Sequence, residues 1–148
     1  MLEFLGDFMT RNNQDEPSTL GKTFGEYFIE KTSGAYLVDG APTYELAHQK
    51  KHDLDVMRHC CESEMRMMRV ENIIAAPFYF ERVAILARKI KDYRLEVDII
   101  EEYLKGVAEY YEKNGLISGE GVMAGPRYQA ISKRLSKAKN LLEKHNNQ

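Results

Sequence analysis

The most regular pattern of hydrophobic and polar positions begins at Tyr44 and predicts α-helices. Residues 44–72 contain neither glycine nor proline, and they are rich in residues that favour helix. Pro77 can occupy the first position of the next helix, which we expect over residues 78–90. The chain from Tyr44 to Asn114 is therefore predicted to be helical, with interruptions before Pro77 and near Lys91.

A second amphipathic pattern occupies residues 94–114, and Gly115 is placed to end that helix. Its apolar stripe runs from Val97 to Tyr111, with Leu104 at the centre. Glycine-rich residues 115–126 predict a connector. Residues 127–145 then predict a last helix with the apolar positions Ile131, Leu135, Ala138, Leu141 and Leu142.

Residues 1–43 are less regular than the rest of the chain. Apolar residues within Leu2–Met9 suggest a short helix, and residues 12–18 are typical of a loop. Aromatic and β-branched residues on both sides of Ser33-Gly34 fit a small β-hairpin, although Phe24, Tyr27 and Phe28 also fit one helical face. Both interpretations remain open at this point.

The helical region repeats weakly at a spacing of 39 residues, with Tyr44 aligned to Val83. This alignment pairs Asp53 with Asp92, and it breaks residues 44–72 into two helices near His52-Asp53. Apolar residues of the first unit also align with apolar residues of the second unit. A period of this length is typical of helix-turn-helix repeats, whose neighbours must stack to bury their apolar faces.

The second unit resembles a tetratricopeptide repeat at the positions of Phe80, Ala84, Ala87, Tyr93, Ile100 and Tyr103. It differs from the family at Lys91, where glycine is usual, and at Glu96, where a small residue is usual. Residues 76–103 are also similar to the C-terminal helical module of some bacterial HIRAN-domain proteins. The resemblance implies a bacterial or phage protein with a helical interaction role and no catalytic residue to transfer.

We therefore expect an all-α fold that consists of an N-terminal segment and a helical repeat domain. Residues 1–43 form an irregular N-terminal segment, and residues 44–148 form two tetratricopeptide-like helical hairpins plus a capping helix.

Composition narrows the class of protein. The 148 residues carry 21 basic and 23 acidic side chains, so a net charge of -2 argues against a nucleic-acid coat protein. The longest apolar run, residues 73–80, is too short to cross a bilayer. The first nine residues lack the charge pattern of a secretory signal, and the location predicted from the sequence is cytoplasmic.

Three histidines could form a metal-binding stripe if residues 44–72 were one helix: His48, His52 and His59. The break near His52-Asp53 would scatter them, so we expect no metal site. Cys60 and Cys61 are adjacent, which favours two packed thiols over a disulfide. Neither the cysteines nor any Ser-His-Asp pattern provides a starting point for an enzyme, and no cofactor is implied.

The last helix has a basic flank that could contact phosphate or an acidic partner: Lys133, Arg134, Lys137 and Lys144. Charge is also separated along the chain. Residues 1–75 carry a net charge of -5 and residues 76–148 a net charge of +3, which allows copies to associate head to tail.

The leading hypothesis is a non-enzymatic protein-interaction module, an adapter or regulatory protein. Its partner would contact the first helix of the second unit at Tyr79, Arg82, Arg88 and Lys89. The alternatives are a nucleic-acid accessory protein that uses the basic flank, and a metal-dependent helical protein that uses the histidine stripe.

Overall fold

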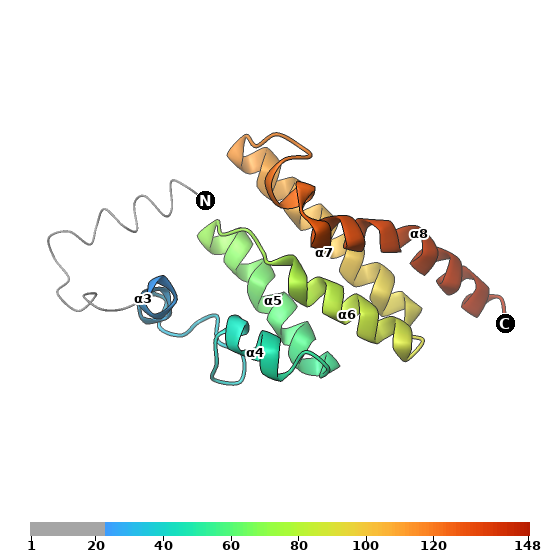
Figure 1. Cartoon of the computed structure of the whole chain (residues 1–148), viewed down its shortest axis with the longest axis horizontal. Coiled ribbons are helices and arrows are strands. Elements are labelled where there is room, and N and C mark those ends of the chain that lie inside the picture. The colour runs from blue at the N-terminus through green and yellow to red at the C-terminus, as the bar shows by residue number, and fades with distance from the viewer. Residues whose placement is uncertain (1–22) are drawn as a thin grey trace, which may run out of the picture.

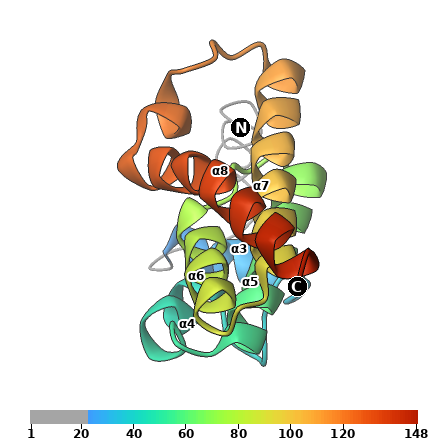
Figure 2. The same ribbon diagram turned by 90° about the vertical axis from the view of Figure 1, so that its right-hand side faces the viewer.

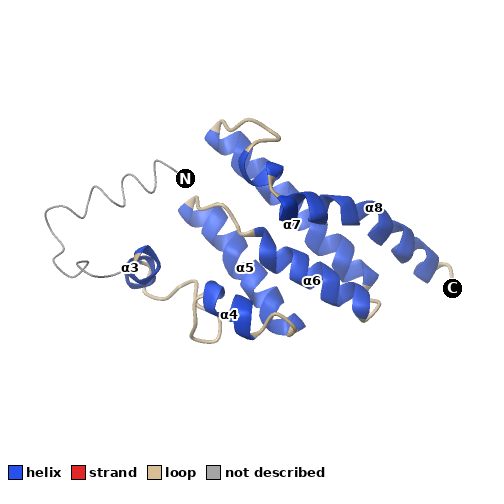
Figure 3. Ribbon diagram, in the orientation of Figure 1, coloured by secondary structure: helices blue, strands red, loops and turns tan. Residues whose placement is uncertain are grey.

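The chain is all-α in the computed structural model, which describes residues 23–148 (Figures 1 and 3). The elements are α3 (Phe24–Lys31), α4 (Thr43–Gln49), α5 (Leu54–Glu71), α6 (Pro77–Lys89), α7 (Tyr93–Asn114), the 3₁₀ turn η2 (Gly121–Ala124) and α8 (Pro126–Asn146). The short helix expected within residues 2–9 and the loop over 12–18 lie outside the described residues. No helix in the described part of the chain is long and apolar enough to cross a membrane.

The two predicted helical hairpins are present as α4–α5 and α6–α7. In each hairpin the second helix begins with an aspartate cap: Asp53 accepts from the Val56 amide at 3.1 Å, and Asp92 accepts from the Leu95 amide at 3.0 Å. These are the aspartates that the 39-residue alignment pairs. The two aligned aspartates therefore have the same role, because each caps the first turn of the second helix in its hairpin.

Helix α6 lies at the centre of the fold and packs against α5, α7 and α8. Pro77 is its first residue, as expected, and Phe80, Val83 and Ala87 are fully buried. Helix α8 crosses α6 and α7 and covers the hairpin formed by those two helices (Figure 2). Ile131 and Ala138 anchor α8 with no exposed surface.

Helices α5 and α7 approach closely at Gly106. A Cβ atom at this position would lie 2.5 Å from the Met65 Cε atom and 2.9 Å from the Met68 Cε atom. Those methionines are 2% exposed, so the absence of a side chain at Gly106 leaves the space that they fill. Methionine acts here as flexible core filler.

The β-hairpin interpretation of residues 24–42 is wrong. Residues 24–31 are helical because the Thr23 hydroxyl caps the Glu26 amide at 3.2 Å and because Phe24 and Phe28 share one face. Ser33 and Gly34 have positive φ, and they end the helix instead of joining two strands. In residues 23–148 strand-like pairing is limited to the single bridge between Val38 and Ala41.

The apolar stripe of α7 is rotated relative to the prediction. Ile100, Tyr103 and Val107 are fully buried, whereas Leu104 is only half-buried. The stripe turns toward Tyr103 because α7 is covered by α6 on one side and by α8 on another, and the Tyr103 ring lies 4.7 Å from that of Phe80.

We expect Ile100→Ala to lower the free energy of unfolding by roughly 2 to 5 kcal/mol, because it removes fully buried carbons and leaves a cavity. Leu104→Ala should cost less than half as much. Urea denaturation of both variants measures the difference. Equal losses would show that the buried face of α7 is assigned incorrectly.

Candidate binding recess

An apolar recess opens where the N-terminal segment meets the first helical hairpin. One wall comes from α3 and the loop that follows it, and the other comes from the start of α4, the middle of α5 and the 72–76 linker. Its volume is about 290 Å³. In Figure 1, α3 lies at the opposite end of the molecule from the C-terminus of α8. The recess therefore lies away from the basic flank of the last helix.

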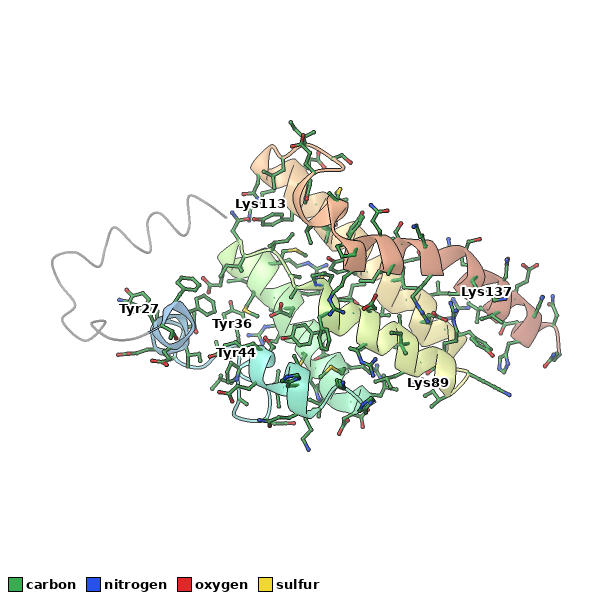
Figure 4. All side chains as sticks on the ribbon, viewed as in Figure 1. Tyr27, Tyr36, Tyr44, Lys89, Lys113 and Lys137 are labelled. Carbon is green, nitrogen blue, oxygen red and sulfur yellow. The ribbon has the colours of Figure 1, made fainter. Side chains whose placement is uncertain are left out.

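Five aromatic side chains line this recess: Phe24, Phe28, Tyr36, Tyr44 and Tyr79. The Phe28 ring stacks with that of Tyr36 at 5.8 Å and with that of Phe24 at 6.1 Å. Phe24 and Tyr44 are 44% and 56% exposed, so they stand at the mouth, whereas Tyr79 is 4% exposed and lies inside. Figure 4 shows Tyr36 and Tyr44 between α3 and the α5–α6 region.

Tyr36 is held in place from three directions. Its hydroxyl donates to the Glu71 carboxylate at 3.0 Å, and its carbonyl accepts from the Ser63 hydroxyl at 2.6 Å. The Arg66 guanidinium lies 5.2 Å from the centre of its ring. These contacts fix the loop after α3 to α5, so the recess is a formed feature of the fold.

The only carboxylate among the residues that line the recess belongs to Glu64, which is 7% exposed. One oxygen accepts from the Ala76 amide at 2.9 Å, and the other accepts from the Thr43 hydroxyl at 3.2 Å. Both donors are neutral. Within the described residues Glu64 forms no ion pair.

Glu96 is a second buried carboxylate, and its partners are arginines instead of neutral donors. It is fully buried on α7, and its Oε2 atom lies 2.8 Å from the Arg88 Nη2 atom and 2.9 Å from the Arg134 Nη2 atom. Arg88 comes from α6 and Arg134 from α8, so the cluster joins three helices. Where the core buries a carboxylate for structure, it surrounds that carboxylate with cations.

Burial raises the pKa of Glu64 above its ordinary value, and the hydrogen bonds from Ala76 and Thr43 only partly oppose this effect. The titratable groups that interact with it include Tyr79 on α6 and Cys60 on α5, and burial raises the pKa of each to about 12. Tyr103 on α7 also interacts with it, and burial raises the pKa of that hydroxyl as well. Cys61 also faces it, and burial raises the pKa of that thiol.

The residues predicted on α6 do not form one surface. Tyr79 lines the recess, but Arg88 binds Glu96, and Arg82 donates to the Lys51 carbonyl at 2.9 Å while approaching the His52 ring at 3.3 Å. These two arginines hold α6 against its neighbours instead of facing a partner. Lys89 is exposed at the end of α6 (Figure 4).

The basic flank of α8 loses one of its four predicted members. Arg134 is 22% exposed and is paired with Glu96, because α8 needs that contact to lie on α6 and α7. Lys133, Lys137 and Lys144 are exposed, and Figure 4 shows Lys137 on α8. A contact with phosphate or with an acidic partner at these three lysines stays a prediction.

The histidine stripe is divided by the break between α4 and α5. His48 lies on α4, His59 lies on α5, and His52 lies in the turn beside Arg82. In residues 23–148 no group of three His, Cys, Asp or Glu side chains is placed to hold a metal ion. Cys60 and Cys61 are both buried and free, which agrees with the packed thiols expected from the sequence.

Comparisons of this chain with models of protein families, with curated proteins and with solved structures find no match. The resemblance to a tetratricopeptide repeat and to the helical module of HIRAN-domain proteins stays a prediction.

The sequence does contain a signal for Glu64. Met57, Cys61 and Met68 are buried on α5, and Glu64 lies three residues after Cys61 and four before Met68, on the same helical face. A glutamate in an otherwise apolar stripe indicates a buried charge. The surrounding recess could not be found this way, because half of its wall comes from residues 24–37, whose structure was ambiguous.

We expect the two buried glutamates to respond oppositely to substitution by glutamine. Because the folded pKa of Glu64 is raised, the folded state holds a proton that the unfolded chain releases near pH 4.5, so ionisation lowers stability as pH rises. Glu64→Gln should therefore stabilise the protein above the raised pKa, with a gain that disappears below pH 4.5. Glu96→Gln should cost about 3 kcal/mol at pH 7, because two arginines lose their counter-ion.

Urea denaturation across pH 4 to 8 measures both effects. A loss of stability in Glu64→Gln that does not change with pH would show that Glu64 is a structural group like Glu96.

Proposed function

We propose that this protein is a non-enzymatic interaction module that binds a peptide segment of a protein partner in the recess between α3 and the α4–α5 hairpin. The observation that carries the proposal is the aromatic lining of the recess around one buried carboxylate. Apolar pockets with a few polar groups are the usual form of a binding site. Aromatic side chains also dominate the energetics of protein interfaces.

The rest of the chain serves as a rigid support. Helices α5 to α8 share one core, and Tyr36 ties the loop after α3 to α5. The two-hairpin arrangement supports an interaction role, since helical hairpins present surfaces between neighbouring helices. The adapter or regulatory role, the cytoplasmic location and head-to-tail association of copies belong to the same proposal.

A peptide-display selection on the immobilised full chain tests this proposal. Ala76→Phe places a ring in the recess, and Ala124→Phe adds the same side chain at an exposed position of η2. Peptides that the parent protein selects should bind Ala76→Phe at least tenfold more weakly and should bind Ala124→Phe as they bind the parent. Failure to select a converging peptide set, or equal binding by both variants, would overturn the proposal.

The nucleic-acid alternative makes a different prediction for α8. Phosphate contacts by Lys133, Lys137 and Lys144 would weaken steeply as salt concentration rises. We expect the parent protein to show no salt-dependent binding of labelled single- or double-stranded oligonucleotides in fluorescence anisotropy. The triple variant Lys133→Glu/Lys137→Glu/Lys144→Glu should give the same anisotropy as the parent. Arg134 is left unaltered because its pairing with Glu96 supports the fold. Tight binding by the parent that this triple variant loses would favour the accessory-protein role.

A further inference from the structure

Glu64 is a buried carboxyl group without a cationic partner in the described part of the chain. Its two hydrogen-bond donors, the Ala76 amide and the Thr43 hydroxyl, satisfy one lone pair on each oxygen, and neither can compensate the charge of the ionised form. The same protein places two arginines on Glu96 at 2.8 and 2.9 Å. Glu64 and Glu96 thus differ in whether an arginine compensates them. Burial of an unpaired charge lowers stability, and an apolar side chain or a nearby arginine would avoid that loss.

The surroundings of Glu64 favour a cation over a neutral donor. Aromatic rings line the recess, and aromatic rings attract an ammonium group that lies over their faces. The N-terminal half of the chain, which builds the recess, carries 13 acidic and 8 basic side chains over residues 1–75. Arg66 contacts the Tyr36 ring without lining the recess.

The shape of the recess also restricts the kind of side chain that could bring a cation to Glu64. Its lining is largely apolar and opens to solvent between Phe24 and Tyr44, while Glu64 is 7% exposed. A group that reaches Glu64 from solvent must therefore pass apolar walls, so its charge must stand at the end of an apolar chain. Lysine has this construction, with a compact charge on a flexible four-carbon stem.

We propose that the recess takes a lysine side chain of a partner peptide, with Glu64 as the counter-ion of its ammonium group and the aromatic side chains around its stem. This inference rests on the proposed function and adds the residue that the site recognises. The partner's lysine thereby gives Glu64 the positive charge that Arg88 and Arg134 give Glu96 within the chain. Glu64 is a specificity-determining residue in this arrangement, since it distinguishes a cationic side chain from an apolar one of equal length.

The decisive test is a double-mutant cycle on the full chain. Peptides from the display selection should share a lysine, and replacement of that lysine by norleucine, which keeps the stem and removes the charge, should weaken binding to the parent at least tenfold. Glu64→Gln keeps an acceptor for the Ala76 amide, and it should bind the lysine and norleucine peptides within about twofold of each other. The gain in affinity from lysine should fall as pH is lowered through the pKa of Glu64.

The outcomes separate this inference from the proposed function. Selected peptides that lack a shared lysine, or that tolerate norleucine without loss, would overturn the role of Glu64 while peptide binding in the recess stands. Absence of any selected peptide would overturn the proposed function itself.

A direct probe does not depend on the selection. In NMR titrations, n-butylammonium, which reproduces the lysine side chain, should shift the amide signals of Ala76 and Thr43 at concentrations at least tenfold lower than 1-butanol does. Glu64→Gln should remove this difference. Equal effects of the two probes on the parent would contradict recognition of a cation, and n-butylammonium binding as tightly as a selected peptide would point to a free amine instead of a peptide.

Discussion

The packing of α6 on three sides is the constraint on which the rest of the structure depends. Helices α5, α7 and α8 all contact α6, so its side chains are committed to the core over most of its surface. The arginines of α6 bind neighbouring segments: Arg88 pairs with Glu96, and Arg82 donates to the Lys51 carbonyl. A central helix of this kind gives a rigid body but no open groove along its own length.

The recess lies at the edge of the fold, where the N-terminal segment meets the first hairpin. Helix α3 has few connections to the core cluster, and the Tyr36 contacts with α5 hold the loop that follows it. Helix α3 has no extensive contact with another helix of the described chain, so its side chains do not interdigitate with the hairpin as those of packed helices do. The recess lined by Phe28 and Tyr36 is the space that this geometry leaves.

Much of the helical architecture could be predicted from the sequence because its signals are local. Pro77, Gly115 and the capping aspartates Asp53 and Asp92 mark helix ends by backbone chemistry that does not depend on distant contacts. The face of α7 was less predictable, since Leu104 and Tyr103 are adjacent and the position of α8 decides which is buried. The site was the least predictable part, because its walls come from residues 24–37, 42–44 and 64–79, which only the tertiary fold brings together.

The two buried glutamates are compensated in different ways in the same core. A carboxylate that holds helices together is best surrounded by cations from those helices, as Arg88 and Arg134 surround Glu96, because compensation within the chain is permanent. A carboxylate that must recognise a visiting cation cannot have a permanent one beside it. Glu64 has only neutral donors, which orient its oxygens without cancelling their charge. Burial raises the pKa of Glu64, so ionisation of this carboxyl group lowers the stability of the folded state as pH rises.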